Sequence, residues 1–301
     1  MSNILSQEIP LVFECVGQSL IGIVHKPAIA SPVGVVTIIA GGPQYRGGVG
    51  RGMVSAAREL AAAGVPVMRF DHRGLGDSGG DFLGFEHIAE DLEAAVAAFR
   101  REVPEVKKVV LWGGCDAASG AMIHGWKIPD AISMVLGNPW VTTAETQSAV
   151  MRKHYLSRLA EWSFWRKVLR FEYNLADYAL SAMQRVRPRF TSWESPQHKN
   201  GTASVPGNSE NYVARMLDGL RRFEGPVLFL MSGQSLLSKE FDELVSRDPN
   251  WREVFHRSAY KRIDFPDADQ TFSGLDSRER VNRAICEWVL ELDSHKGKCR
   301  P

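Results

Sequence analysis

The sequence predicts an α/β fold built on a mostly parallel, doubly wound sheet. Two observations carry this prediction. Apolar, β-branched runs alternate with helical patterns through the first half of the chain, which is typical of parallel strands joined by helices. One such run, residues 34–40, is continuous rather than alternating, as expected for a strand buried on both faces. Ligands of this fold class bind at the carboxyl ends of the strands.

The expected elements follow in order along the chain. Two short runs at residues 11–15 and 20–25 flank a Val-Gly-Gln-Ser turn and predict a hairpin. Buried strands are expected at residues 34–40, 65–70, 109–114 and 131–136, with helices at 51–63, 85–102 and from the cysteine turn to about 126. Late strands are expected at 226–233 and 260–263, before a last helix at 277–292.

The regular alternation breaks after Trp140, and this break divides the chain. We expect an α/β core from residues 1–141 and 209–294, an inserted helical lid with its loop at 142–208, and a frayed tail at 295–301. Between residues 142 and 190, nine basic residues outnumber four acidic ones. This excess is either a solvated helical face or a surface for an anionic partner, such as a CoA thioester or an acidic acyl carrier.

Composition limits the classes of function. The 301 residues, 44% of them hydrophobic, suffice for one large domain with an insertion or for two small ones, and the net charge of +1 favours no nucleic-acid partner. No apolar run is long enough to span a membrane, and the polar N-terminus lacks a signal-peptide core. The four cysteines are scattered without zinc spacing. We expect a reduced, cytoplasmic protein without a metal or other cofactor.

Cys115 stands where a strand is expected to turn sharply into a helix. Its surroundings, G-x-C-x-A, are one step from the G-x-S-x-G nucleophile elbow. Small neighbours let the backbone pass through a strained left-handed turn, and the start of a helix favours a thiolate. The alternative interpretation is an ordinary buried cysteine.

Six segments together resemble a known family. They are residues 41–46 (GGPQYR), 70–78 (FDHRGLGDS), 112–119 (WGGCDAAS), 138–141 (NPWV), 232–233 (SG) and 269–273 (DQTFS). In this order and spacing they resemble the α/β-hydrolase superfamily, and within it the exosortase-system-associated hydrolases with a cysteine elbow. The resemblance covers nearly the whole chain. It implies that Cys115 is the nucleophile, that an acid follows the strand after the lid, and that a histidine lies in the loop after the last strand.

Two positions depart from the family pattern. Ser235 stands where the resemblance implies the acid, and Gln270 stands where it implies the histidine. Glutamine cannot take up a proton near neutral pH, and serine carries no charge to stabilise an imidazolium. His124 is too distant to substitute, about 13 Å along the helix from the elbow. His72 and His256 remain alternatives.

Other polar residues near the expected site have two interpretations each. Asp267 and Asp269 either supply a carboxylate to the site or are solvated loop charges. Asp71, Arg73, Gly74 and Gly76 are interpreted as structural, with an Asp/Arg pair tying the loop after its strand.

An oxyanion hole needs two backbone N–H donors. The first is expected at Asp116, directly after the cysteine, and the second at Gln44 or Gly42, because Pro43 has no N–H.

Two functions remain open at this point. The first is an enzyme that acts on a small-molecule or carrier-bound ester or thioester through Cys115, with a degenerate triad. The second is a pseudo-hydrolase used for binding, or a repurposed fold that catalyses acyl transfer or cyclisation. The intact elbow favours the first, and the residues at positions 235 and 270 favour the second.

Overall fold

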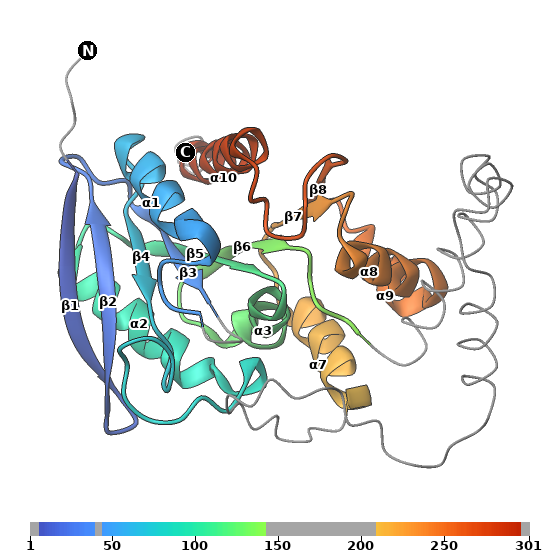
Figure 1. The fold of residues 1–301 in the computed structure, drawn as a ribbon, viewed down its shortest axis with the longest axis horizontal. Helices are drawn as coiled ribbons and strands as arrows, with labels where there is room; N and C mark the ends of the chain where they lie inside the picture. The colour runs from blue at the N-terminus through green and yellow to red at the C-terminus, as the bar shows by residue number, and fades with distance from the viewer. Residues whose placement is uncertain (1–5, 40–43, 143–208, 296–301) are drawn as a thin grey trace, which may run out of the picture. The chain divides into compact units, whose positions relative to one another are not determined.

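The computed structural model describes residues 6–39, 44–142 and 209–295. In this part of the chain, eight strands form one sheet in the order β1-β2-β4-β3-β5-β6-β7-β8 (Figure 1). The N-terminal strands β1 and β2 pair antiparallel, and the strands from β4 to β8 run parallel to one another. The predicted fold class, with its N-terminal hairpin, is confirmed.

The strands lie close to their predicted places. They are β1 (Gln7–Cys15), β2 (Gln18–Lys26), β3 (Val33–Ile38), β4 (Val67–Phe70), β5 (Lys108–Gly114), β6 (Ala131–Gly137), β7 (Val227–Ser232) and β8 (Tyr260–Phe265). Strand β3 is buried along its whole length, as its continuous β-branched run predicts. Val35 packs into the core on one face of the sheet and Val36 into the core on the other, because successive side chains of a strand point in opposite directions.

Helices cover both faces of the sheet. On one face lie α1 (Gly52–Ala62) and α10 (Leu275–His295), which contact each other (Figure 1). On the other face lie α2 (Ala89–Glu102), α3 (Asp116–His124), α7 (Ser209–Arg222), α8 (Leu236–Arg247) and α9 (Pro249–Phe255). Short 3-10 turns flank three of these helices. The turn η1 (Val49–Arg51) precedes α1, η2 (Phe85–His87) precedes α2, and η3 (Gly125–Lys127) follows α3.

No helix was predicted at α7, α8 or α9. A signal for α7 was present, because Tyr212, Val213, Met216, Leu217 and Leu220 follow helical spacing and are all buried. Helix α8 begins at a serine cap, and α9 begins with a proline in its first turn after an aspartate cap. Both helix starts carry local signals in the sequence.

The predicted lid, with its excess of basic residues, lies outside the described residues except for Thr142. The same holds for most of the predicted tail. Among the helices that are described, none is long and apolar enough to cross a membrane.

Candidate functional site

Cys115 lies at the apex of a sharp turn between β5 and α3. Its backbone has φ 57° and ψ −126°, a conformation that non-glycine residues rarely adopt. The Cys115 N–H donates to the carbonyl of Gly137 at 2.8 Å, and its own carbonyl accepts from Ser119 N at 3.2 Å and from Trp140 N at 3.3 Å. The strained turn is therefore held by the neighbouring strand end and by the first turn of the helix.

The two glycines before Cys115 differ in whether their positions have room for a side chain. A Cβ on Gly113 would lie 2.8 Å from the backbone carbon of Ala117, so this position needs glycine. A Cβ on Gly114 would make only ordinary contact, 3.7 Å from the carbonyl oxygen of Gly137. The steric requirement for glycine thus rests on Gly113, where strand and helix approach most closely.

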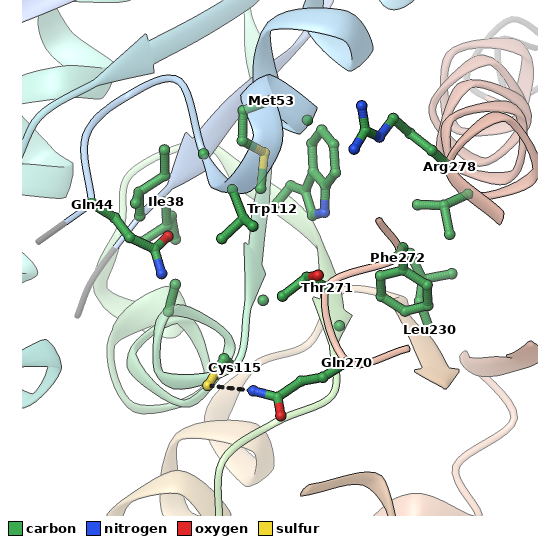
Figure 2. Close-up of a pocket in the computed structure, with 18 of the residues that line it drawn as sticks. Ile38, Gln44, Met53, Trp112, Cys115, Leu230, Gln270, Thr271, Phe272 and Arg278 are labelled. Carbon is green, nitrogen blue, oxygen red and sulfur yellow. Dashed lines mark hydrogen bonds between the residues drawn. The ribbon is translucent and has the colours of Figure 1, made fainter. Parts of the chain in front are cut away.

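A pocket opens beside the sulfur of Cys115 (Figure 2). It lies at the carboxyl ends of the parallel strands, as expected for this fold class. Its walls are mostly apolar, with polar groups contributed by Gln44, Asp116, Gln270, Thr271, Arg278 and Asn282.

Gln270 is the side chain that approaches the sulfur. Its Nε2 lies 3.9 Å from Cys115 Sγ, although the two residues are 155 positions apart in the chain (Figure 2). Gln270 belongs to the turn after β8, where the Asp269 carboxylate accepts from Thr271 N at 2.8 Å and from Ser273 N at 3.1 Å. These bonds, with those from the two hydroxyls, lower the pKa of Asp269 to about 2. Asp269 therefore shapes the turn and does not line the pocket.

Asn138 fixes the same turn from the other side. Its Nδ2 donates to the backbone carbonyl of Gln270 at 2.8 Å, and its Oδ1 accepts from Ser232 N at 2.8 Å and from Ser238 Oγ at 2.6 Å. Asn138 thereby joins the ends of β6 and β7, the start of α8 and the Gln270 turn. Asn138 was predicted only as part of the Asn-Pro-Trp-Val motif, without a role of its own.

The environment of Cys115 opposes ionisation. Burial and the neighbouring Asp116 carboxylate raise the pKa of the Cys115 thiol to about 11, while the Asp116 N–H and the Gln270 amide act in the opposite direction. The start of α3 therefore favours the thiolate, as expected, but burial and the Asp116 carboxylate outweigh that effect. Burial also raises the pKa of Asp116 to about 7, against a hydrogen bond from Ala117 N at 2.9 Å.

Of the three residues predicted to supply the oxyanion hole, Asp116 and Gln44 lie in the described part of the chain. The Asp116 N–H points at the Cys115 sulfur and lowers its pKa, and Gln44 lines the pocket on the opposite side from Gln270 (Figure 2). Gly42 lies outside the described residues.

The loop that carries Gln44 is anchored to the strand beside it. Arg69 donates to the carbonyl of Arg46 at 2.7 Å, and the Arg46 guanidinium pairs with Asp71 and, at 2.8 Å, with Asp77. A Cβ on Gly76 would lie 2.3 Å from the Asp71 carboxylate, which explains that glycine.

Asp71 and Arg73 do not pair with each other, contrary to the predicted Asp/Arg pair. Arg73 instead pairs with Asp91, and with Glu90 at 3.1 Å. A Cβ on Gly74 would lie 2.2 Å from the Phe82 backbone nitrogen, so this glycine permits a close backbone approach. The loop is thus tied at two separate points.

Ser235 is buried and caps a helix. Its Oγ accepts from Leu237 N at 3.2 Å and from Ser238 N at 3.4 Å at the start of α8. It is not among the residues that line the pocket. The geometry thus accounts for Ser235 by capping, and its assignment to the acid position stays a prediction.

No histidine of the described residues lines the pocket. His72 is fully buried with Nδ1 3.3 Å from Asp91, His124 lies 3.0 Å from the carbonyl of Glu86, and His256 Nδ1 lies 2.6 Å from the carbonyl of Arg252. Asp267 pairs with Arg280 at 2.9 Å. Over the same described ranges, no group of three or more His, Cys, Asp and Glu side chains is placed to hold a metal ion.

The comparisons with known proteins agree with this geometry. A family model described as serine aminopeptidase, S33, matches residues 30–262. No curated protein matches the chain.

Three solved structures illustrate the similarity of the fold. The Pyrococcus furiosus esterase Pf2001 has a TM-score of 0.62 at 15% identity, over 95% of this chain and 91% of the esterase. DcsB, in complex with its substrate analogue, has a TM-score of 0.63 at 17% identity, over 95% and 99% of the two chains. Proline iminopeptidase from Mycobacterium smegmatis has a TM-score of 0.55 at 13% identity, over 96% and 100%. At these identities the likeness shows the fold alone.

Proposed function

The chain belongs to the serine aminopeptidase S33 family and is a hydrolase of the α/β-hydrolase fold, and from that premise we propose that it cleaves an ester or thioester through Cys115. The observation that carries the proposal is the position of Cys115. The residue stands at a strained elbow, on the wall of a mostly apolar pocket, with an amide from Gln270 directed at its sulfur. From the motifs quoted above we further propose that the chain belongs to the exosortase-system-associated branch.

The proposed reaction has two steps. In the first, the Cys115 sulfur bonds to the substrate carbonyl carbon, the bond to the leaving thiol or alcohol breaks, and the thiol proton passes to the leaving group. The Asp116 N–H and the loop that carries Gln44 stabilise the negative oxygen. In the second step, water adds to the acyl carbon, and the free acid and the Cys115 thiol are released.

The protonated thiol limits the range of substrates. With a pKa of about 11, roughly one Cys115 in ten thousand is a thiolate at pH 7. Gln270 can hydrogen-bond to the sulfur or to a water, but it cannot accept the proton. Activated acyl groups, such as thioesters on a small molecule or a carrier, are therefore the expected substrates.

A thiol-directed acyl probe tests this assignment. Cys286 serves as the internal reference, because it is partly exposed and its pKa is also raised by burial. We expect acylation at Cys115, mapped by mass spectrometry, to be at least about tenfold faster than at Cys286, because of the elbow and its donors. Equal rates at the two thiols would refute the proposal.

A second candidate is a binding protein or a non-hydrolytic acyl-transfer enzyme, and Gln270 is the observation in its favour. The double variant Ser235→Asp with Gln270→His separates the two. Aspartate also caps helices, so the start of α8 is retained. A large gain in esterase activity would mean that the native chain lacks an efficient base and is specialised away from ester hydrolysis. An unchanged or reduced rate would favour native chemistry that uses Gln270 itself.

A further inference from the structure

The pocket continues past Cys115 into an arm between the start of α1 and the start of α10. Apolar side chains line this arm, namely Val49, Met53, Trp112 and Val281. Figure 2 labels Met53 and Trp112 among them. Arg278 reaches into the same arm from α10, and Figure 2 shows its guanidinium on the side of Met53 and Trp112, away from Gln270. A bound molecule that touches Cys115 would therefore extend along apolar walls towards a cation.

Arg278 has no acidic partner within the described residues. Its Nη1 and Nη2 donate only to the backbone carbonyls of Gly50 at 3.4 Å and Ser273 at 3.2 Å, and its buried Nε has no partner. Arg280, two positions further along α10, is paired with Asp267 and Asp276 at 2.9 and 3.0 Å. Because a guanidinium has five N–H donors and a full charge, Arg278 retains unused capacity to bind an anion.

Asn282 lies one helical turn further along α10 and lines the same pocket. It is only 3% exposed, and its Nδ2 has no hydrogen-bond partner. Side chains four positions apart share one face of a helix, so Asn282 and Arg278 project to the same side of α10. Buried donors without partners are uncommon in folded proteins. Two of them at one end of a pocket indicate a missing acceptor.

We propose that this end of the pocket, formed by Arg278 and Asn282, is a subsite for a carboxylate carried by the substrate. This inference rests on the proposed function and names its substrate class: an acyl ester or thioester whose acyl chain ends in a second, free carboxylate. The apolar arm accommodates the methylene chain, and the two side chains supply donors for the terminal oxygens. A guanidinium with a neighbouring amide matches a singly charged, planar carboxylate.

Matched thioesters test the subsite in the intact protein. Glutaryl and pentanoyl thioesters of N-acetylcysteamine have the same chain length and differ by the terminal carboxylate. We expect kcat/KM to be about tenfold or more higher for the glutaryl substrate, as for a charge-assisted hydrogen bond. In Arg278→Met, that ratio should fall to near one. In Arg283→Met, which removes an exposed arginine of α10 outside the pocket, the ratio should stay unchanged.

Asn282→Asp provides a second variant of nearly the same shape. It places a carboxylate beside Arg278 while the backbone bonds of the guanidinium remain possible, so it should also abolish the preference for the glutaryl substrate. Equal rates for the two substrates in the unmodified protein, or a preference that survives in both variants, would overturn the subsite.

Binding measured without turnover separates this proposal from the proposed function. By calorimetry, monomethyl glutarate should bind about tenfold tighter than methyl pentanoate, and Asn282→Asp should remove the difference. If neither thioester is cleaved but this difference is present, the proposed hydrolysis is wrong and the subsite stands. If both methyl esters bind equally, the subsite is wrong whatever the activity.

Discussion

Two cysteine sites in this protein contrast in composition and in surroundings. Cys15 donates to Asp91 at 3.2 Å, and Asp91 also lies 3.3 Å from His72 Nδ1, so a cysteine, a histidine and an aspartate meet at one place. Among the described residues, the Cys115 sulfur faces the Gln270 amide, at 3.9 Å, and the N–H and carboxyl groups of the adjacent Asp116.

The Cys15 site has the residue types of a catalytic set but no access. Cys15, His72 and Asp91 are 4%, 0% and 2% exposed, and none of them lines the pocket. Asp91 also forms an ion pair with Arg73, so its charge is balanced within the fold. Cys115 lacks the usual partners, yet it stands in a strained turn on the pocket wall. Under the proposed function, access and backbone position, more than the residue types gathered, distinguish the nucleophile from a structural cysteine.

The largest effect should follow from removing the accessible thiol. Cys115→Ala should lower turnover of an acyl substrate by about 10³-fold or more, because the nucleophile is lost. Cys15→Ala should leave turnover within about twofold, since that thiol cannot meet substrate. Steady-state kinetics on both purified variants measures the contrast. A large loss in Cys15→Ala, with unchanged stability, would contradict the comparison.

The buried cluster should matter for stability. Asp91→Ala should lower the free energy of unfolding by about 3–5 kcal/mol, because Arg73 and His72 lose their buried acceptor. Glu90→Ala removes an exposed partner of Arg73 and should cost about 0–1 kcal/mol. Urea denaturation measures both. Similar losses of unfolding free energy in the two variants would show that the buried cluster stabilises the fold no more than the exposed ion pair does.

Because of the same Asp91 carboxylate, we expect the stability of the fold to depend on pH in the acid range. Hydrogen bonds from His72, Cys15 and Arg73, with the His72 charge, lower the pKa of Asp91 below its ordinary value, although burial opposes them. Its contribution to stability is therefore present above pH 3.8 and lost as the pH falls through the depressed pKa. The free energy of unfolding should therefore fall less between neutral and acid pH in Asp91→Asn than in the unmodified protein, as urea denaturation at a series of pH values measures. An equal fall in both proteins would show that Asp91 does not contribute to the acid dependence.

A smaller change should follow at the accessible thiol when its charged neighbour is neutralised. Asp116→Asn keeps the backbone N–H but removes the carboxylate that helps raise the pKa of Cys115 to about 11. The Cys115 pKa should fall, by about one unit, and alkylation by iodoacetamide at pH 8 should become about tenfold faster. Rates measured from pH 7 to 10 should rise with pH in both proteins. An identical pH profile in the variant would show that burial alone sets the pKa.

The smallest effect is expected for Cys15→Ser. The hydroxyl can donate to Asp91 as the thiol does, so the change in unfolding free energy should stay within about 1 kcal/mol. Thermal unfolding of this variant beside Cys15→Ala measures what the hydrogen bond contributes. A greater loss in the serine variant than in the alanine variant would show that packing of the sulfur dominates.

The predicted fold was largely recoverable because its signals are local. The β-branched run of β3 and the hairpin of β1 and β2 follow from hydrophobic pattern and turn residues within short windows. The elbow was predicted because Gly113 and Cys115 lie two positions apart, and the steric clash that requires glycine at position 113 is with Ala117, four positions along the chain. Helix α7 was missed although its apolar spacing was present.

Sequence by itself determined the parallel sheet, the sharp turn at Cys115 and the residue types at the carboxyl ends of the strands. These features depend on neighbours along the chain. Only the tertiary structure decided that Gln270 lies beside the sulfur. It also brought Arg278, which has no acidic partner in the described residues, and Asn282, whose Nδ2 has no hydrogen-bond partner, into the same pocket. The tertiary structure also decided that the pKa of the Cys115 thiol is raised, since burial raises this pKa more than the start of α3 lowers it. These properties depend on solvent exclusion and on contacts between segments more than a hundred positions apart.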